Sequence, residues 1–146
     1  MIRIHGEIHS SKNSRRAIIH NGRNFVVKSA VAKQDEKTIG YQLMDYEKRN
    51  EWARMCMGQY YPLYVEFRFI RKTKRRWDFA NLVQGVADAM VKAGYIPDDD
   101  VEHFIPVYVP HYVNKDAPGI EIEVILPPTC SEYGVTIGST SLTEGE

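Results

Sequence analysis

The stretch YPLYVEFRFI, residues 61–70, restricts the fold more than any other part of the chain. Apolar and polar side chains alternate along it with the period of two that a β-strand produces. One face would carry Leu63, Val65, Phe67 and Phe69. A strict alternation returns in IEIEVIL, residues 120–126. We therefore expect a β-sheet that buries one face, which other elements must cover.

Further strand and turn signals lie on either side of this segment. MIRIHGEI, residues 1–8, alternates apolar residues and predicts a short first strand. Residues 16–29 carry two β-branched runs around Asn21-Gly22, a pair that tolerates positive φ and favours a hairpin turn. Residues 104–113 indicate an edge strand, because the two prolines within them cannot serve in the middle of a sheet.

Two segments have helical patterns. Residues 29–58 look largely helical, but Gly40 is unfavourable in a helix interior by about 1 kcal/mol relative to Ala. We therefore expect this helix to begin only near Thr38. The second helix follows Asp78 and ends at Gly94, a typical C-terminal cap. The order of the elements predicts an α+β fold, with a mixed sheet and about two helices packed on one face.

Length and composition exclude several classes of protein. A chain of 146 residues that is 43% hydrophobic can form one folded domain. We place that domain at residues 1–126 and expect a loosely ordered tail at 127–146, where Pro, Thr, Ser and Gly dominate. No apolar run approaches the roughly eighteen residues that span a bilayer, and the N-terminus has no signal-peptide core. We therefore expect a soluble, cytoplasmic protein.

Charge is distributed unevenly, although the chain as a whole is neutral. Residues 1–97 hold 18 Lys and Arg against 9 Asp and Glu, whereas residues 98–146 hold 1 against 10. The densest cationic run, Lys72 to Arg76, stands just before Asp78. This distribution indicates either a basic face that binds a polyanion or two halves that neutralise each other in the fold.

The helix that follows the basic run has two distinct faces. At about 100° per residue its apolar residues share one arc, and Asp78, Asn81, Gln84 and Asp88 share the other. The simpler interpretation is a solvated face in which Asp78 caps the helix. The alternative is a carboxylate site for Mg²⁺ beside a DNA phosphate, with the upstream cations on neighbouring phosphates. It requires the acids at 98–100 to meet Asp78, which the spacing alone does not force.

The stretch RRWDFANLVQGVADAMVKAGYIPDD, residues 75–99, resembles the RusA-like Holliday-junction resolvases, small dimeric Mg²⁺-dependent endonucleases of phages and prophages. That family has a basic run, then Asp-x-Asp-Asn-x-x-x-Lys at a helix start, Asp-Ala-Leu, Ala-Gly and Asp-Asp. The matching positions here are Arg75-Arg76, Asp78, Asn81, Asp88-Ala89-Met90, Ala93-Gly94 and Asp98-Asp99. The polar loop at 9–16 and the order of elements over residues 1–126 are also similar to the family's.

The resemblance implies a homodimeric endonuclease that resolves Holliday junctions or related branched DNA with Mg²⁺. It implies metal binding by Asp78, Asp98 and Asp99. It also implies a catalytic set of Asp78, Asn81, Gln84 and Asp99, in which the two amides orient water or ligands. The backbone phosphates would bind two groups of cations: Lys12, Arg15 and Arg16 in one, and Lys72, Lys74, Arg75 and Arg76 in the other.

Two positions depart from the family's pattern. Ala80 stands where the family has its second acid, and Gln84 stands where it has lysine. Loss of one carboxylate weakens Mg²⁺ binding, and loss of a cation at the transition state lowers a rate by orders of magnitude. Candidates to replace the lost groups are Asp88, Asp100, Lys74 and Lys92. The alternative function is therefore a branched-DNA-binding protein of the same fold that is impaired in cleavage.

Two further groups of residues have open roles. Lys12, Arg15 and Arg16 either contact phosphates or form a plain solvated loop. Phe25 and Trp77 either stack on exposed bases or pack in the core.

Overall fold

The computed structural model describes residues 1–9, 15–28 and 30–128, and at residues 15, 16 and 28 it describes the backbone only. Most of the predicted tail therefore lies outside the described residues. The elements, in chain order, are β1 (Ile2–His5), β2 (Arg15–His20), β3 (Arg23–Lys28), α1 (Ala30–Leu43), α2 (Tyr46–Cys56), β4 (Leu63–Arg71), α3 (Phe79–Lys92), β5 (Phe104–Tyr108), β6 (Tyr112–Val113) and β7 (Gly119–Ile125).

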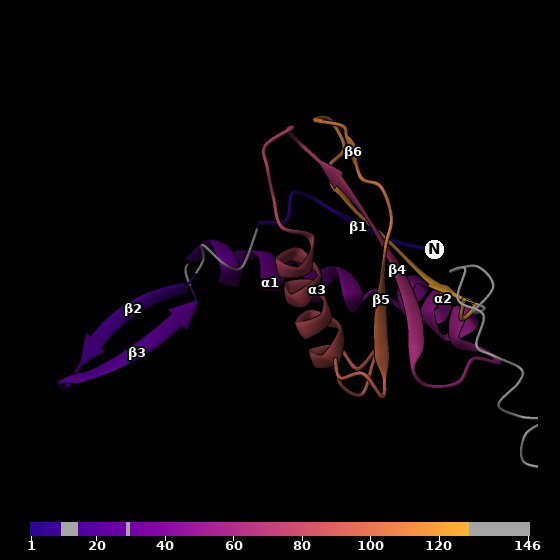
Figure 1. Ribbon diagram of the computed structural model, residues 1–146, viewed down its shortest axis with the longest axis horizontal. Coiled ribbons are helices and arrows are strands. Elements are labelled where there is room, and N and C mark those ends of the chain that lie inside the picture. Colours follow the sequence, from indigo (N-terminus) through magenta and orange to yellow (C-terminus); the bar gives the residue numbers. More distant parts are fainter. Residues whose placement is uncertain (10–14, 29, 129–146) are drawn as a thin grey trace, which may run out of the picture.

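The main sheet is mixed, which confirms the predicted α+β class. Its strand order is β1-β7-β4-β5, and β6 pairs with the end of β4. β7 is antiparallel to both β1 and β4, whereas β5 and β6 run parallel to β4. The proline-containing strand β5 lies at the edge, as predicted (Figure 1). The central strand β4 therefore carries the chain from one end of the sheet to the other.

The alternation along β4 is the basis of the core. Leu63, Val65, Phe67 and Phe69 are all at most 4% exposed, as the sequence predicts. They belong to one cluster with buried residues of β1, β7 and the three helices. The opposite face of the sheet is polar, where Arg3 forms an ion pair with Glu121 at 3.1 Å. The helices thus cover one face of the sheet only.

The helical region before β4 differs from the prediction. It holds two helices instead of one, so residues 1–128, apart from the gaps at 10–14 and 29, contain three helices, and α1 begins at Ala30, not near Thr38. Gly40 lies inside α1, because burial of Ile39 and Leu43 outweighs the low helix propensity of glycine. The break between α1 and α2 occurs at Asp45, whose side chain accepts a hydrogen bond from the backbone N–H of Lys48 and caps α2.

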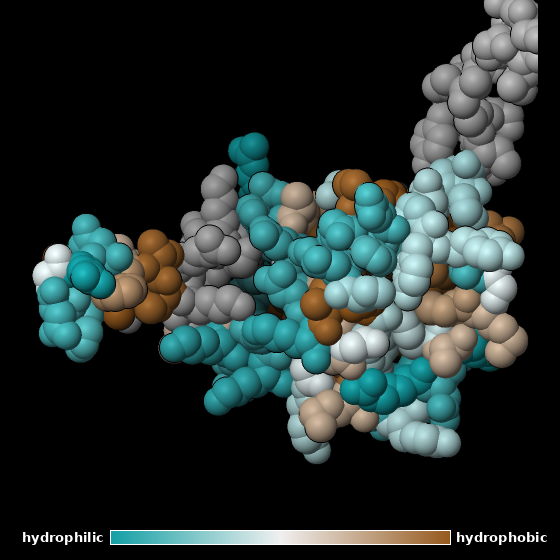
Figure 2. Space-filling model, turned by 90° about the horizontal axis from the view of Figure 1, so that it is seen from below, coloured by the Kyte–Doolittle hydropathy of each residue, from teal (hydrophilic) through white to brown (hydrophobic). Residues whose placement is uncertain are grey.

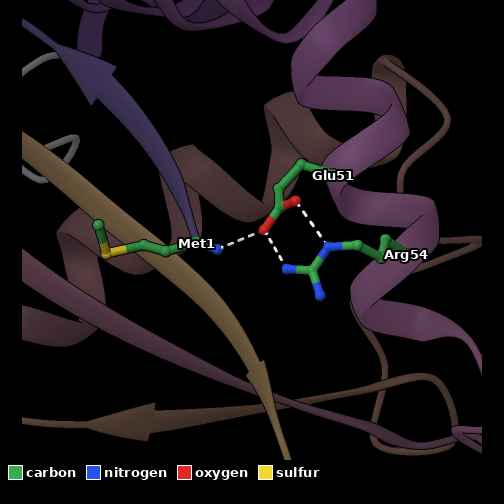
Figure 3. A network of polar contacts seen from close by, with 3 residues as sticks. All are labelled: Met1, Glu51 and Arg54. Carbon is green, nitrogen blue, oxygen red and sulfur yellow. Dashed lines mark hydrogen bonds and ion pairs between the residues drawn. The ribbon is translucent and has the colours of Figure 1, made fainter.

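Polar contacts join the helices to each other and to β1. Tyr95, which follows α3, donates its hydroxyl to the Leu43 carbonyl at 2.6 Å, and its own carbonyl accepts from Trp52 Nε1 at 2.9 Å. Glu51 in α2 accepts from the amino group of Met1 at 2.7 Å and from Arg54 (Figure 3). These contacts fix all three helices relative to one another and to the start of the sheet.

Strand β1 approaches β7 closely at Gly119. The register pairs Gly119 with His5, and the N–H of Gly6 donates to the Pro118 carbonyl at 3.0 Å. A Cβ at residue 119 would lie 2.2 Å from the Ile4 carbonyl oxygen. Only glycine therefore fits between the two strands at this position.

A separate hairpin of β2 and β3 projects from the body of the molecule (Figure 1). Its turn at Asn21-Gly22 has φ of 50° and 73°, which confirms the predicted hairpin. Both faces of the hairpin expose apolar side chains: Ile18 and Phe25 pair on one face, and Ile19 and Val26 lie on the other. Figure 2 shows this uncovered hydrophobic surface at the left. We call the hairpin, residues 15–28, the arm.

None of the helices in the described part of the chain has the length and apolar character of a membrane span.

Candidate functional site

A polar pocket lies where β4 leads into α3. Its volume is about 1100 Å³. The chain after β1, the end of β4, the connecting loop and the first turn of α3 all contribute to it. Its cations are Arg71, Lys72, Arg75 and Arg76, its carboxylates are Glu7 and Asp78, and the other lining residues are His9, Thr73, Trp77, Phe79 and Asn81. We call it the basic pocket, because four cations face two carboxylates.

Asp78 stands at the N-terminus of α3 in an extended conformation, with φ −106° and ψ 118°. Its carboxylate accepts a long hydrogen bond, 3.4 Å, from the backbone N–H of Asn81. The predicted capping role of Asp78 is therefore confirmed. Capping does not occupy the whole carboxylate, since the side chain is exposed and lines the basic pocket. Asn81 lines the same pocket, so two of the predicted catalytic residues lie together.

The acids after α3 lie far from Asp78 within one chain. A helix of 14 residues is about 21 Å long, and Asp78 precedes it whereas Asp98 and Asp99 follow it. The backbone N–H of Leu63, at the start of β4, donates to the carbonyl of His103 at 3.0 Å, so this turn lies at the opposite end of β4 from the basic pocket. One chain therefore does not bring Asp78 together with Asp98 and Asp99.

The acidic turn has structural partners of its own. Asp98 accepts from the backbone N–H of Asp99 at 2.8 Å, and Asp100 accepts from the ring of His103 at 2.7 Å. Chiefly because of this hydrogen bond to His103, the pKa of the Asp100 carboxyl is lowered. These contacts shape the turn between α3 and β5.

The two positions that depart from the family's pattern are both exposed. Ala80 and Gln84 do not line the basic pocket, although Gln84 belongs to the predicted catalytic set. Asp88 is half-buried one turn further along α3. Lys92, at the end of α3, forms an ion pair with Glu36 of α1.

The predicted DNA-binding cations fall into two places. Lys72, Arg75 and Arg76 line the basic pocket, and Lys74 is exposed in the same loop. The backbone of Arg15 and Arg16 lies in β2 of the arm. Lys12 lies outside the described residues.

Three titratable residues of the basic pocket were missed from the sequence, namely Glu7, His9 and Arg71. His9 is held by Asp35 of α1, which accepts from its backbone N–H at 2.8 Å and lies 3.1 Å from its ring Nδ1. Nothing in the local pattern around Glu7 and His9 indicates a site. Arg71 did carry a signal, because it continues the inward-facing series of β4 and puts a charge at a core position.

The two aromatic residues whose roles were left open differ in their burial. Trp77 is partly buried and packs on the core, with its ring centroid 5.4 Å from Phe69 and 5.3 Å from Phe79. Core packing is therefore confirmed for Trp77. Phe25 is 45% exposed on the arm, so the interpretation that it packs in the core is wrong. Its place on a projecting hairpin removes it from the body of the molecule.

The residues that one chain gathers do not fit a metal site with three or four carboxylates. The basic pocket offers Glu7 and Asp78, and the described residues include no group of three or more His, Cys, Asp and Glu side chains suited to a metal ion. Asp78 and Asn81 supply oxygen ligands of the kind Mg²⁺ prefers, but too few for such a site.

The family of the chain follows from a comparison with known proteins. No curated protein matches the chain. The family model described as "Endodeoxyribonuclease RusA" matches residues 10–125, which include the arm, the acidic turn and every residue of the basic pocket except Glu7 and His9. The match covers well over half of the chain, so this protein belongs to the RusA endodeoxyribonuclease family.

Proposed function

We propose that this protein is a structure-specific endonuclease that resolves Holliday junctions or related branched DNA with Mg²⁺. One observation carries the proposal: the basic pocket joins four cations to an exposed carboxylate at a helix N-terminus. Clustered lysine and arginine side chains bind the phosphates of a DNA backbone. A helix N-terminus also favours the negative charge of a phosphate group. The scissile phosphate would lie at the mouth of the pocket, beside Asp78.

Lys72, Arg75 and Arg76 would hold the neighbouring phosphates. Such contacts fix the register of a protein on DNA without reading its sequence. Asn81, in the first turn of α3, would orient the phosphate or the attacking water. The requirement for Mg²⁺ rests on membership of the family, because the acids that the structure describes do not form a complete site within one chain. We therefore assign no step of the reaction to a metal.

A second function is favoured by two residues. Ala80 and Gln84 replace an acid and a lysine of the family's pattern, and one chain keeps Asp78 apart from Asp98 and Asp99. A protein altered in this way would hold branched DNA without cutting it. It would bind with the strong salt dependence of phosphate contacts and would need no metal.

A single experiment separates these functions. A labelled four-way junction is incubated with the wild-type protein, Asp78→Asn and Glu47→Gln, with and without Mg²⁺. Glu47 is exposed on α2 outside the pocket and serves as the matched control. The nuclease gives paired nicks that Asp78→Asn abolishes and Glu47→Gln retains. Because asparagine is also a good N-cap, Asp78→Asn leaves the fold intact.

The other results of the same experiment are equally informative. Tight junction binding with no nicks at any Mg²⁺ concentration supports the non-cutting function. Absence of binding at low salt excludes both functions and leaves a fold with a merely solvated basic loop.

We further propose that the protein acts as a homodimer whose two copies cover each other's arms. An isolated two-stranded hairpin is marginally stable in water, and this one exposes Ile19 to 77% and Val26 to 69%. A symmetric dimer also supplies two sites for the two strands that resolution must cut. The double variant Ile19→Lys, Val26→Lys is expected to be monomeric by light scattering, whereas Glu47→Lys, on α2 and outside the arm, stays dimeric. A double variant that remains dimeric contradicts this role of the arm.

A further inference from the structure

One cation of the basic pocket is buried, whereas the others are exposed. Arg71, the last residue of β4, is 9% exposed, and Lys72, Arg75 and Arg76 all lie in the exposed class. Within the described residues, Arg71 is the one charged or polar residue that is buried. A fully or nearly buried arginine normally has an anionic partner, because desolvation of a guanidinium is unfavourable.

Among the described residues, no anion is a hydrogen-bond partner of Arg71. Its Nη1 donates to the Ile8 carbonyl at 2.6 Å, and its guanidinium carbon lies 5.3 Å from the centroid of the Trp77 ring. Its Nε is buried and has no hydrogen-bond partner in the described part of the chain. Burial lowers the pKa of Arg71, and the charge of Glu7 opposes that shift only in part. An arginine remains protonated under such conditions, so an incompletely compensated charge stands at the wall of the pocket.

A purely structural role explains the contacts of Arg71 poorly. A hydrogen bond to a carbonyl oxygen does not require a charged donor. An apolar side chain would fill the space beside Trp77 without the desolvation of a cation, and such replacements are often neutral or stabilising. The buried charge is therefore better explained by a ligand that carries the opposite charge.

The geometry favours a phosphate group as this ligand. The Ile8 carbonyl and the Trp77 ring hold the guanidinium in one orientation, and a fixed guanidinium binds two oxygens of a phosphate side by side. The pocket that Arg71 lines also contains Asp78 and the first turn of α3. A phosphate there would lie between a buried cation and the positive end of a helix.

We propose that Arg71 binds the DNA phosphate that lies beside Asp78, and so supplies at the floor of the basic pocket the fixed cation that Gln84 cannot supply. This assignment rests on the proposed function, because it takes the ligand of the pocket to be DNA. Gln84 is exposed and lies outside the pocket lining, whereas Arg71 and Asp78 share it.

The first test compares Arg71→Met with Arg75→Ala, which removes an exposed cation of the same pocket. Each variant is unfolded with urea, and its affinity for a labelled four-way junction is measured in EDTA at several salt concentrations. Arg71→Met is expected to be as stable as the wild type but to bind roughly tenfold more weakly or worse, with a salt slope lower by about one. Arg75→Ala is expected to lower the slope similarly but to weaken binding less. Binding by folded Arg71→Met within twofold of the wild type overturns the proposal.

The second test needs no variant to fold. The Nε–H signal of Arg71 and the indole signal of Trp77 are followed by NMR while the wild-type protein is titrated with the junction, and separately with inorganic phosphate. Both signals are expected to move at saturating junction. If the junction binds and neither signal moves, Arg71 is not the phosphate ligand and the proposed function stands. If the junction does not bind at all, the proposed function fails together with this inference.

Discussion

Substitution of Trp77 by alanine should destabilise the fold, although Trp77 lines a pocket that we assign to DNA. The ring packs on Phe69 and Phe79, lies 5.0 Å from the ring of His111, and receives the Arg71 guanidinium on one face. Truncation of a fully buried tryptophan to alanine lowers the free energy of unfolding by about 3–5 kcal/mol. Because Trp77 is only partly buried, we expect about 2–4 kcal/mol, which includes the aromatic contacts at about 0.5–1.5 kcal/mol each.

Urea unfolding followed by circular dichroism measures this loss. Trp77→Phe should retain most of the packing and lose only about 1 kcal/mol, and the folded variant should bind the four-way junction like the wild type. Tyr108→Ala is the control, since Tyr108 is 55% exposed beside the same aromatic group and should lose less than about 1 kcal/mol. If Trp77 instead stacked on bases, Trp77→Ala would weaken DNA binding but leave the free energy of unfolding nearly unchanged. Weaker binding with an unfolding free energy within about 0.5 kcal/mol of the wild type would refute the packing role.

Two further predictions concern the contacts that position the helices. Tyr95→Phe should lower the free energy of unfolding by about 1–2 kcal/mol, because it leaves the buried Leu43 carbonyl without its hydroxyl donor; an unchanged urea midpoint would contradict this. The pKa of Glu51 is lowered from 4.5 to about 2, first by Arg54 and then by the amino group of Met1. The stability that the Glu51 carboxylate contributes is present above pH 4.5 and is lost as the pH falls toward 2. Glu51→Gln should therefore weaken the pH dependence of the free energy of unfolding in that window. Parallel curves of unfolding free energy against pH for the two proteins would contradict this.

The sequence correctly predicted those elements whose conformation depends on a few neighbouring residues. The alternation of β4, the Asn21-Gly22 turn and the capping role of Asp78 all follow from a few neighbouring residues, and the structure confirms each of them. Pro106 in β5 and Pro110 after it likewise predicted the edge position of this strand. In these cases the preference of the segment and its environment agree.

The predicted start of α1 was wrong because tertiary packing outweighs helix propensity there. Gly40 is a poor helix residue, but Ile39 and Leu43 on either side of it are buried against the sheet. A single sequence does not show which of these effects is larger.

The basic pocket could be predicted only in part, because it is assembled from segments distant in the sequence. The basic loop and Asp78 adjoin in the chain and were identified together. Glu7 and His9 join them through the pairing of β1 with β7 and through the contact of His9 with Asp35. The separation of Asp78 from Asp99 follows from the length of α3, which the sequence did indicate.

Gly119 does not line the basic pocket, but its lack of a side chain affects the shape of that pocket. Residues 7–9 leave β1 immediately after the point where β1 and β7 come closest, so their route to the basic pocket depends on that contact. A methyl group at position 119 would displace β1 and move Glu7 and the Ile8 carbonyl, which holds Arg71. Variation at position 119 would thus alter the pocket that we assign to DNA through the backbone alone, while every charged residue of the pocket stayed the same.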